Sequence, residues 1–272
     1  MVSTLSLVCM GLTALAAVVL PVVLVILGRR RWHFSLWSCA VGALVFVVAV
    51  LILESATHSL VFAAAPILRS NRALYVLYGS LAAGVFEELG RVCGFAVLRR
   101  SGRGPDDVGH PIGAGIGHGG IEAMALVGVA MISSIVTSVS IINAGASDAF
   151  LSRLPESQRD AVAHQLESLI STPAPFYLLS IGERAIAIAL HITLSVLVWM
   201  AFTARIRRWW IFGAILAHAL ADVGAALYQV GLLSVIAAQA WALVVTVILA
   251  VAVRRVYRSA EPPRPREGAK AS

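Results

Sequence analysis

Residues 4–28 read TLSLVCMGLTALAAVVLPVVLVILG, contain no charged side chain, and are followed directly by Arg29, Arg30 and Arg31. A helix of this length rises far enough to cross the roughly 30 Å hydrocarbon core of a bilayer. A cleaved signal peptide would instead show a basic start and a shorter apolar core of about 7–15 residues. The stretch therefore predicts an uncleaved transmembrane helix.

The rest of the chain has the same character. Of its 272 residues, 59% are apolar and only 13% are charged, whereas about a quarter of the residues of a soluble domain are charged. This composition excludes a disordered chain, a secreted disulfide-bonded scaffold and an ordinary soluble enzyme. The predicted spans are residues 4–28, 34–62, 73–98, 111–142, 176–202, 209–230 and 232–253. We therefore expect an all-α fold, a polytopic membrane bundle of about seven transmembrane helices.

The basic residues predict the orientation of these spans. With seven spans, most of them fall on one side of the membrane, within residues 29–31, 99–103, 205–208 and 254–270. The other side holds Arg69, Arg72, Arg153 and Arg159. Cytoplasmic loops carry the excess of Lys and Arg, so we expect the N-terminus outside and the C-terminus in the cytoplasm. Because the net charge of +7 is spread over several loops, no nucleic-acid partner is expected.

The chain is expected to form one transmembrane domain over residues 1–258. Residues 259–272 are rich in Pro and Arg and predict a disordered cytoplasmic tail. The one long loop, residues 143–175, falls on the outer side. After Pro155 its apolar residues recur at helical spacing, which predicts an amphipathic helix along the outer membrane surface.

Ionisable residues deep inside the predicted spans are the main functional signal, because such groups are costly in lipid and usually face the bundle interior. They are Glu87, Glu88, Arg91, His118, Glu122, Glu183, Arg184, His191, His218 and Asp222. The helical rise places the two adjacent glutamates and the three histidines roughly 10 Å above the inner face, and the other acids with Arg184 roughly 16–21 Å above it. One polar site is therefore predicted. We expect it to lie in the cytoplasmic half of the membrane and to open towards that half.

Spacing along each helix predicts which of these groups meet. Glu87 and Arg91 are four residues apart, as are His118 with Glu122 and His218 with Asp222, so each pair shares a helix face. Residues 113–120 carry small-xxx-small glycine pairs, which bring helices close together. Glu54 and His58 fall near the far end of the second span and are expected at the outer interface.

Charge leaves the chemistry of this site open. Five acids face two arginines, a formal −3 if all the acids are ionised and the histidines are neutral. Protonated acids, protonated histidines or a bound cation would each resolve that excess. The adjacent Glu87 and Glu88 beside histidines suit an acid/base pair. Three convergent histidines with a carboxylate suit Zn²⁺ equally well.

At these residues the chain resembles the YhfC family of intramembrane peptidases. The segments that carry the resemblance are residues 86–91 (FEELGR), 117–122 (GHGGIE), 217–222 (AHALAD), and Glu183 and Arg184 with His191. The wider group contains CAAX-processing and PrsW-type glutamic proteases and the scaffold subunit of γ-secretase. The resemblance implies a multi-pass protein of a cell membrane, here a bacterial plasma membrane. Its partners would be membrane lipid and a membrane-protein or peptide substrate.

Two versions of the chemistry follow from that resemblance. In a glutamic version without cofactor, Glu88 or Glu87 activates a water, His191 and His218 hold that water or stabilise the oxyanion, and Arg91 tunes the glutamates, while His118 with Glu122 completes the site. In a metal version Zn²⁺ binds His118, His191 and His218, with Glu88 as the base. The histidines lie on separate helices without an HExxH pair, which slightly favours the glutamic version. A non-catalytic scaffold and a proton- or ion-coupled transporter remain as alternatives, and a cavity open on one side only would favour the peptidase.

Overall fold

The computed structural model describes residues 1–100 and 108–260, which form helices joined by short turns. Five long helices are α1 (Thr4–Trp32), α5 (Arg72–Arg99), α10 (Ala174–Phe202), α11 (Trp210–Gln229) and α12 (Val235–Ser259). Two more long helices contain π-helical segments. The first runs through α2 (Leu36–Phe46), η1 (Val47–Glu54) and α3 (Ser55–Ala64). The second runs through α6 (Gly109–Glu122), η2 (Ala123–Gly128), α7 (Val129–Thr137) and η3 (Ser138–Ile142).

These seven helices confirm the predicted all-α membrane bundle. Six of the helices described are long and apolar enough to cross a membrane. The seventh, α5, is 28 residues long and carries Glu87, Glu88 and Arg91 in its interior. The tail predicted for residues 259–272 lies, from residue 261 onward, outside the described residues.

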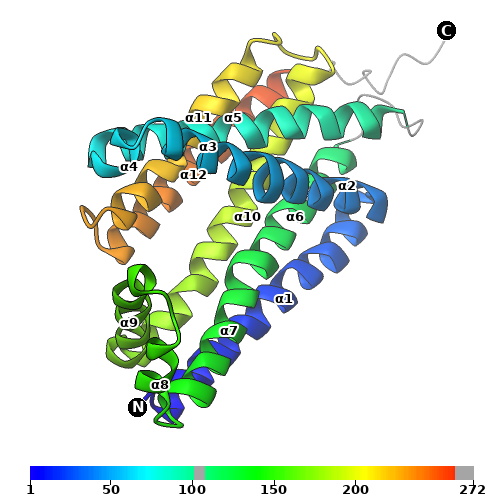
Figure 1. Cartoon of the computed structure of the whole chain (residues 1–272). Coiled ribbons are helices and arrows are strands. Elements are labelled where there is room, and N and C mark those ends of the chain that lie inside the picture. The colour runs from blue at the N-terminus through cyan, green and yellow to red at the C-terminus, as the bar shows by residue number, and fades with distance from the viewer. Residues whose placement is uncertain (101–107, 261–272) are drawn as a thin grey trace, which may run out of the picture.

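The two ends of the bundle differ in charge. At one end, which we call the cytoplasmic end, Arg99 of α5 lies over the Phe202 ring of α10 at 5.9 Å, and Arg205 lies over the Tyr257 ring of α12 at 5.1 Å. The opposite, outer end holds the N-terminus, the short helices α4 (Ile67–Ser70) and α8 (Ser147–Ser152), helix α9 (Glu156–Ser171) and the turn between α11 and α12. The N-terminus lies beside α8, far from the end of α5 (Figure 1).

Helices α1, α6–α7 and α10 run side by side, while α2–α3 and α5 cross over them (Figure 1). Glycines of α6 make this crossing possible. A Cβ atom on Gly117 would overlap the Cys39 carbonyl oxygen of α2, and one on Gly115 would lie 2.5 Å from the Ile192 Cα of α10. The predicted close packing at the small-xxx-small pairs is thus confirmed, and it brings His118 against both neighbouring helices.

The cytoplasmic half of the bundle is a packed apolar core. Phe95 and Leu98 of α5 are buried there with Leu194, Val198 and Trp199 of α10. The Phe95 and Trp199 rings meet edge to face at 5.1 Å. This core closes the bundle between the polar residues and the cytoplasmic end.

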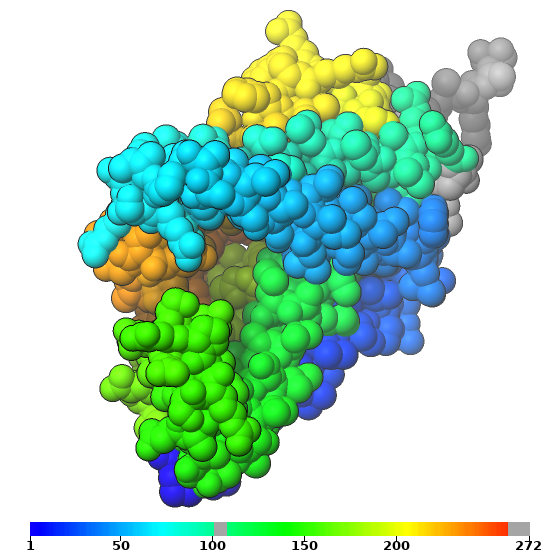
Figure 2. Space-filling model, in the orientation of Figure 1, coloured from blue at the N-terminus to red at the C-terminus, as the bar shows by residue number. Residues whose placement is uncertain are grey.

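The outer half of the bundle is hollow. A cavity of ≈ 930 Å³ reaches from Glu87 and His218 in the middle of the bundle to Tyr75, Thr172 and Gln229 at the outer end. Figure 2 shows the surface hollowed between α9 and the outer ends of α4 and α12. The expected opening towards the cytoplasmic half is therefore wrong. Depth along each helix does not reveal on which side neighbouring helices splay apart.

Helix α9 confirms the helix predicted inside the loop of residues 143–175. Its apolar face, with Val162, Leu166 and Leu169, packs against Met10 of α1 and Tyr177 of α10. This contact covers the outer ends of α1 and α10 and places α9 beside the mouth of the cavity.

Candidate active site

Helix α5 presents its two adjacent glutamates to different surroundings. Glu88 is 0% exposed and accepts two hydrogen bonds from Arg91, from Nε at 2.9 Å and from Nη2 at 3.1 Å. Arg91 also donates to Ser195 Oγ at 2.7 Å. Of the two glutamates expected to pair with Arg91, Glu88 does so, and the Glu87–Arg91 pair allowed by the four-residue spacing does not form. Residues three and four apart both neighbour one another on a helix, and here α5 is turned so that Glu88 and Arg91 face the packed side.

Glu88 in turn orients His218 of α11. The His218 Nδ1 atom lies 2.7 Å from Glu88 Oε1. Because an ionised carboxylate only accepts hydrogen bonds, Nδ1 carries a proton in this contact, so the lone pair of the neutral ring is on Nε2. His218 Nε2 lies 3.5 Å from Asp222 Oδ2, as the four-residue spacing predicts, and 3.7 Å from Glu87 Oε2.

One oxygen atom, Glu87 Oε2, is the point on which the three predicted histidines converge. His118 Nε2 of α6 lies 2.9 Å from it, and His191 Nδ1 of α10 and His218 Nε2 of α11 each lie 3.7 Å away. We call Glu87, His118, His191 and His218 the Glu87 cluster. Four helices thus contribute one residue each to a single buried site.

The Glu87 cluster has the donor chemistry and spacing of a zinc site. Single ligand atoms of Glu87, His118 and His191 all lie within 4.8 Å of one another. In a tetrahedral site with Zn–N and Zn–O bonds of about 2.0–2.2 Å, the ligand atoms are about 3.3–3.6 Å apart, and the contacts with Glu87 Oε2 bracket that range. Glu87 forms no salt bridge with an arginine or lysine of residues 1–100 and 108–260. These residues therefore fit a divalent cation. The third candidate ligand beside His118 and His191 is thus Glu87, where the sequence predicted His218. His218 Nε2 lies near the Oε2 atom of Glu87.

A second layer of charges, which includes Glu122, lies on the outer side of His191, while Arg91 contacts the same ring from the packed side. His191 Nε2 lies 2.6 Å from Glu122 Oε2, and Arg91 Nη2 donates to His191 Nδ1 at 3.2 Å. Both contacts place the His191 proton on Nε2. The lone pair of Nδ1, the nitrogen nearer to Glu87, accepts from Arg91 here, so His191 would bind an ion through Nδ1 once Arg91 turned aside. A carboxylate on the far nitrogen is the usual way to orient a histidine that binds a metal.

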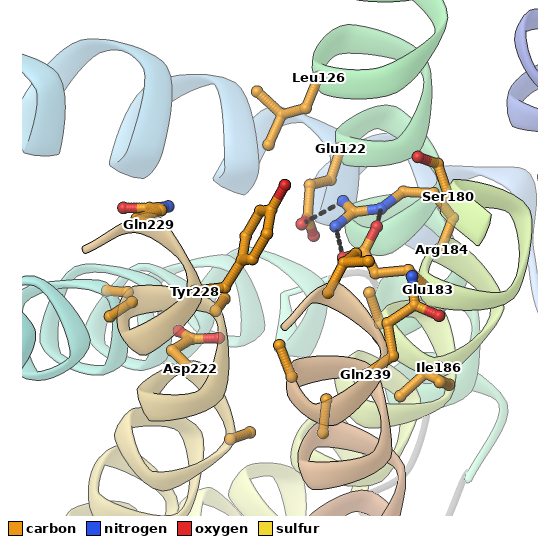
Figure 3. A pocket seen from close by; sticks show the side chains of 18 of the residues that line it. Glu122, Leu126, Ser180, Glu183, Arg184, Ile186, Asp222, Tyr228, Gln229 and Gln239 are labelled. Carbon is orange, nitrogen blue, oxygen red and sulfur yellow. Dashed lines mark hydrogen bonds and ion pairs between the residues drawn. The ribbon is translucent and has the colours of Figure 1, made fainter. Parts of the chain in front are cut away.

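Arg184 joins the remaining acids of this layer. Its guanidinium donates to Glu122 Oε1 at 2.7 Å and to both oxygens of Glu183 (Figure 3). The predicted pairing of His118 with Glu122 is wrong, because His118 turns to Glu87 while Glu122 contacts Arg184 and His191. Asp222 lies apart from this group on α11 (Figure 3).

Sequence reasoning misplaced Glu54 and His58. Glu54 is 5% exposed and lines the cavity rather than lying at the outer interface. His58 Nε2 lies 3.2 Å from Glu54 Oε1, and His58 Nδ1 lies 2.9 Å from the Tyr78 hydroxyl. The signal was present, since two ionisable residues four apart in an apolar span seldom face lipid.

The cavity decides which of these groups meets water. Glu87, Glu122, His191, His218 and Asp222 line it, whereas Glu88 is enclosed by Arg91 and His218. The cavity therefore leads from the outer end to the Glu87 cluster, and His218 lies between the cavity and Glu88.

Comparisons with known proteins show what this chain is similar to. A sequence profile of the family described as YhfC intramembrane metalloprotease matches residues 16–255. The membrane protein YhfC of Bacillus subtilis (strain 168) is 34% identical over 236 residues, which are 86% of this chain and 89% of that protein. No solved structure matches the chain.

Proposed function

Because this chain belongs to the YhfC family of intramembrane metalloproteases, we propose that it hydrolyses peptide bonds of membrane proteins at the Glu87 cluster. The observation that carries the proposal is the convergence of three imidazole nitrogens on Glu87 Oε2, at 2.9, 3.7 and 3.7 Å. A site of three histidines and one carboxylate, reached by a cavity, has the parts that metal-assisted hydrolysis needs.

Glu87, His118 and His191 would hold the metal ion, and Zn²⁺ is the ion that this donor set suits best. The bound ion supplies Lewis acidity that polarises the scissile carbonyl. Glu122 acts beyond these ligands, because its contact with His191 Nε2 at 2.6 Å fixes the ring that faces Glu87. Arg184 in turn holds Glu122.

His218 is the proposed general base. In the neutral ring its Nε2 has the lone pair, and His218 lines the cavity, where Nε2 would take a proton from the water that attacks the carbonyl carbon. Glu88 accepts from Nδ1–H at 2.7 Å and stabilises the imidazolium that forms, and Arg91 holds Glu88 in place. His218 then gives the proton to the leaving amine as the carbon–nitrogen bond breaks, so one water is consumed for each bond cleaved.

The shape of the cavity favours this function over transport. Every residue that lines the cavity lies at the depth of the Glu87 cluster or closer to the outer end. Beyond the cluster, the core around Trp199 and Leu194 is closed. A carrier needs access from both sides in turn, whereas a protease needs one water-filled access route.

Hydrolysis of internally quenched hydrophobic peptides by the purified full-length protein in nanodiscs tests the proposal. We expect cleavage that a chelator stops and added Zn²⁺ restores, and none from the His118→Ala variant. Glu167→Gln, an exposed change on α9, is the control and should cleave normally. Cleavage that resists chelation but is lost in Glu87→Gln would contradict the metal and support the glutamic version.

A further inference from the structure

The outer part of the cavity contains acidic groups that the proposed chemistry does not use. Glu54 is buried, and its Oε2 atom accepts no hydrogen bond from the described residues. Glu54 lines the cavity together with Glu87 and Asp222, close enough for the three carboxyl groups to interact electrostatically. A buried acceptor without a partner is destabilising, so a donor that enters the cavity beside Glu54 would offset this cost.

The charge around Glu54 selects the kind of donor. The ion pairs that Glu54 and Asp222 form in the described part of the chain are with histidines, His58 at 3.2 Å and His218 at 3.5 Å, and neither acid forms a salt bridge with an arginine or lysine there. Arg184, which also lines the cavity, is already held by Glu122 and Glu183. The wall formed by Glu54 and Asp222 therefore favours a cation.

An aromatic wall stands next to these acids. Phe62 stacks on His58 with ring centroids 5.7 Å apart and on Tyr75 with centroids 6.1 Å apart. All three rings line the same cavity as Glu54. The faces of aromatic rings attract ammonium and guanidinium groups, and they also accommodate the aliphatic stem of a long basic side chain.

We infer that Glu54 and Asp222, beside the aromatic wall of Phe62 and Tyr75, bind the positively charged side chain of a lysine or arginine in the substrate. The inference rests on the proposed function and specifies its substrate class, a membrane segment with a basic residue near the scissile bond. A basic side chain inside an apolar segment is unfavourable in lipid. The acids of this subsite offset that cost when the segment is bound in the enzyme, but not while the segment lies in lipid.

Photolabelling with a pair of peptides tests the subsite directly. Both are short hydrophobic peptides with one photoreactive leucine; one carries a lysine, and the other has norleucine, the same stem without the ammonium, at that position. The protein is full length, in nanodiscs of phosphatidylglycerol, a lipid without an ammonium group. We expect labelling of cavity residues at about tenfold lower concentration of the lysine peptide.

Variants of the protein distinguish the effect of this subsite from the effect of other acidic residues and from a loss of folding. Glu54→Gln should reduce the lysine preference to about twofold or less, Asp222→Asn should weaken it, and Glu167→Gln on the outside of α9 should leave it unchanged. Equal labelling by the two peptides in the wild type would overturn the inference, as would a preference that both Glu54→Gln and Asp222→Asn retain. Loss of the preference in phosphatidylethanolamine discs would reassign the subsite to lipid headgroups.

Labelling needs no turnover, so the two proposals fail separately. A lysine preference without any hydrolysis would contradict the proposed function alone. Hydrolysis that proceeds equally well on peptides with and without the basic residue would contradict the subsite alone.

Discussion

The two halves of this bundle are built from helices of similar apolar content but are packed in opposite ways. In the cytoplasmic half, Phe95, Leu194 and Trp199 are buried in an apolar core between the helices. In the outer half the same helices splay apart around a cavity of ≈ 930 Å³. The difference shows that a closed apolar end can seal and support a polar site that is open at the other end.

The boundary between the halves runs between two adjacent residues. Glu88 belongs to the packed half, where Arg91 and His218 satisfy its oxygens. Glu87 belongs to the hollow half, where it meets three histidines and forms no salt bridge with a guanidinium among the described residues. We therefore expect the same chemical change at the two positions to have different consequences.

The largest expected effect is on activity at the hollow side of this boundary. Glu87→Gln removes a proposed metal ligand, and hydrolysis of the quenched peptides should fall at least about a thousandfold, since the metal contributes several kcal/mol to transition-state stabilisation. The variant should still elute as a folded, monodisperse protein. Activity within about tenfold of the wild type would place the chemistry elsewhere.

At the packed side of the boundary the effect should be on stability. Glu88→Gln leaves the buried Arg91 guanidinium without its counter-charge, which costs about 3 kcal/mol in the free energy of unfolding. Glu183→Gln makes the same change beside Arg184, but Glu183 is about one-third exposed, so the loss should be under about 1 kcal/mol. Unfolding in sodium dodecyl sulfate compares the two variants. Equal losses would mean that the two ion pairs are equally buried.

The rate at which a thiol reagent added outside the cell reaches each half of the bundle should distinguish the two halves directly. In a variant that lacks Cys9, Cys39 and Cys93, a cysteine at Ala83 should react with a membrane-impermeant thiol reagent on the order of a hundredfold faster than one at Ser195. Ala83 lines the cavity, and Ser195 is buried beside Arg91. Mass spectrometry of intact cells gives the two rates. Faster labelling at Ser195, or labelling only from the cytoplasm, would reverse the assigned direction of opening.

Helix packing should show the smallest of these effects. Gly115→Ala places a methyl group 2.5 Å from the Ile192 Cα atom, and we expect a loss of about 1–2 kcal/mol in stability. Gly11→Ala on α1 meets no atom within 4 Å and should be neutral or slightly stabilising. Thermal unfolding of the two variants tests this difference. A Gly115→Ala protein as stable as the wild type would show that α6 and α10 separate easily.

Much of the fold follows from sequence, because the apolar length of each span and the positions of the charged residues can both be read along the chain. The seven spans and their orientation were predictable from apolar length and from the arginines at alternate ends. Gly115 and Gly117 also predicted close packing of α6 against its neighbouring helices. The polar residues of the site were predictable as a group, since ten ionisable side chains in membrane-spanning helices are costly in lipid and therefore face the bundle interior.

What sequence could not give was rotation about the helix axes and the gaps between helices. Arg91 reaches Glu88 as easily as Glu87 along an ideal helix, and the neighbouring helices decide between them, α11 through His218 and α10 through Ser195. The π-helical segment Val47–Glu54 alters the helical phase, so a period of 3.6 residues does not show where Glu54 points. The side on which the cavity opens depends on contacts of α9 and α12 far from the site in sequence.

The most direct test of the account is the zinc content of the purified protein and its dependence on the Glu87 cluster. Elemental analysis after dialysis against zinc should give about one equivalent per chain for the wild type and for Glu167→Gln, and a small fraction of that for Glu87→Gln and His118→Ala. The same loss of bound zinc in both variants, with folding intact, is the predicted result. Wild-type protein that binds no zinc, or variants that bind it as well as the wild type, would contradict a metal site at Glu87, His118 and His191.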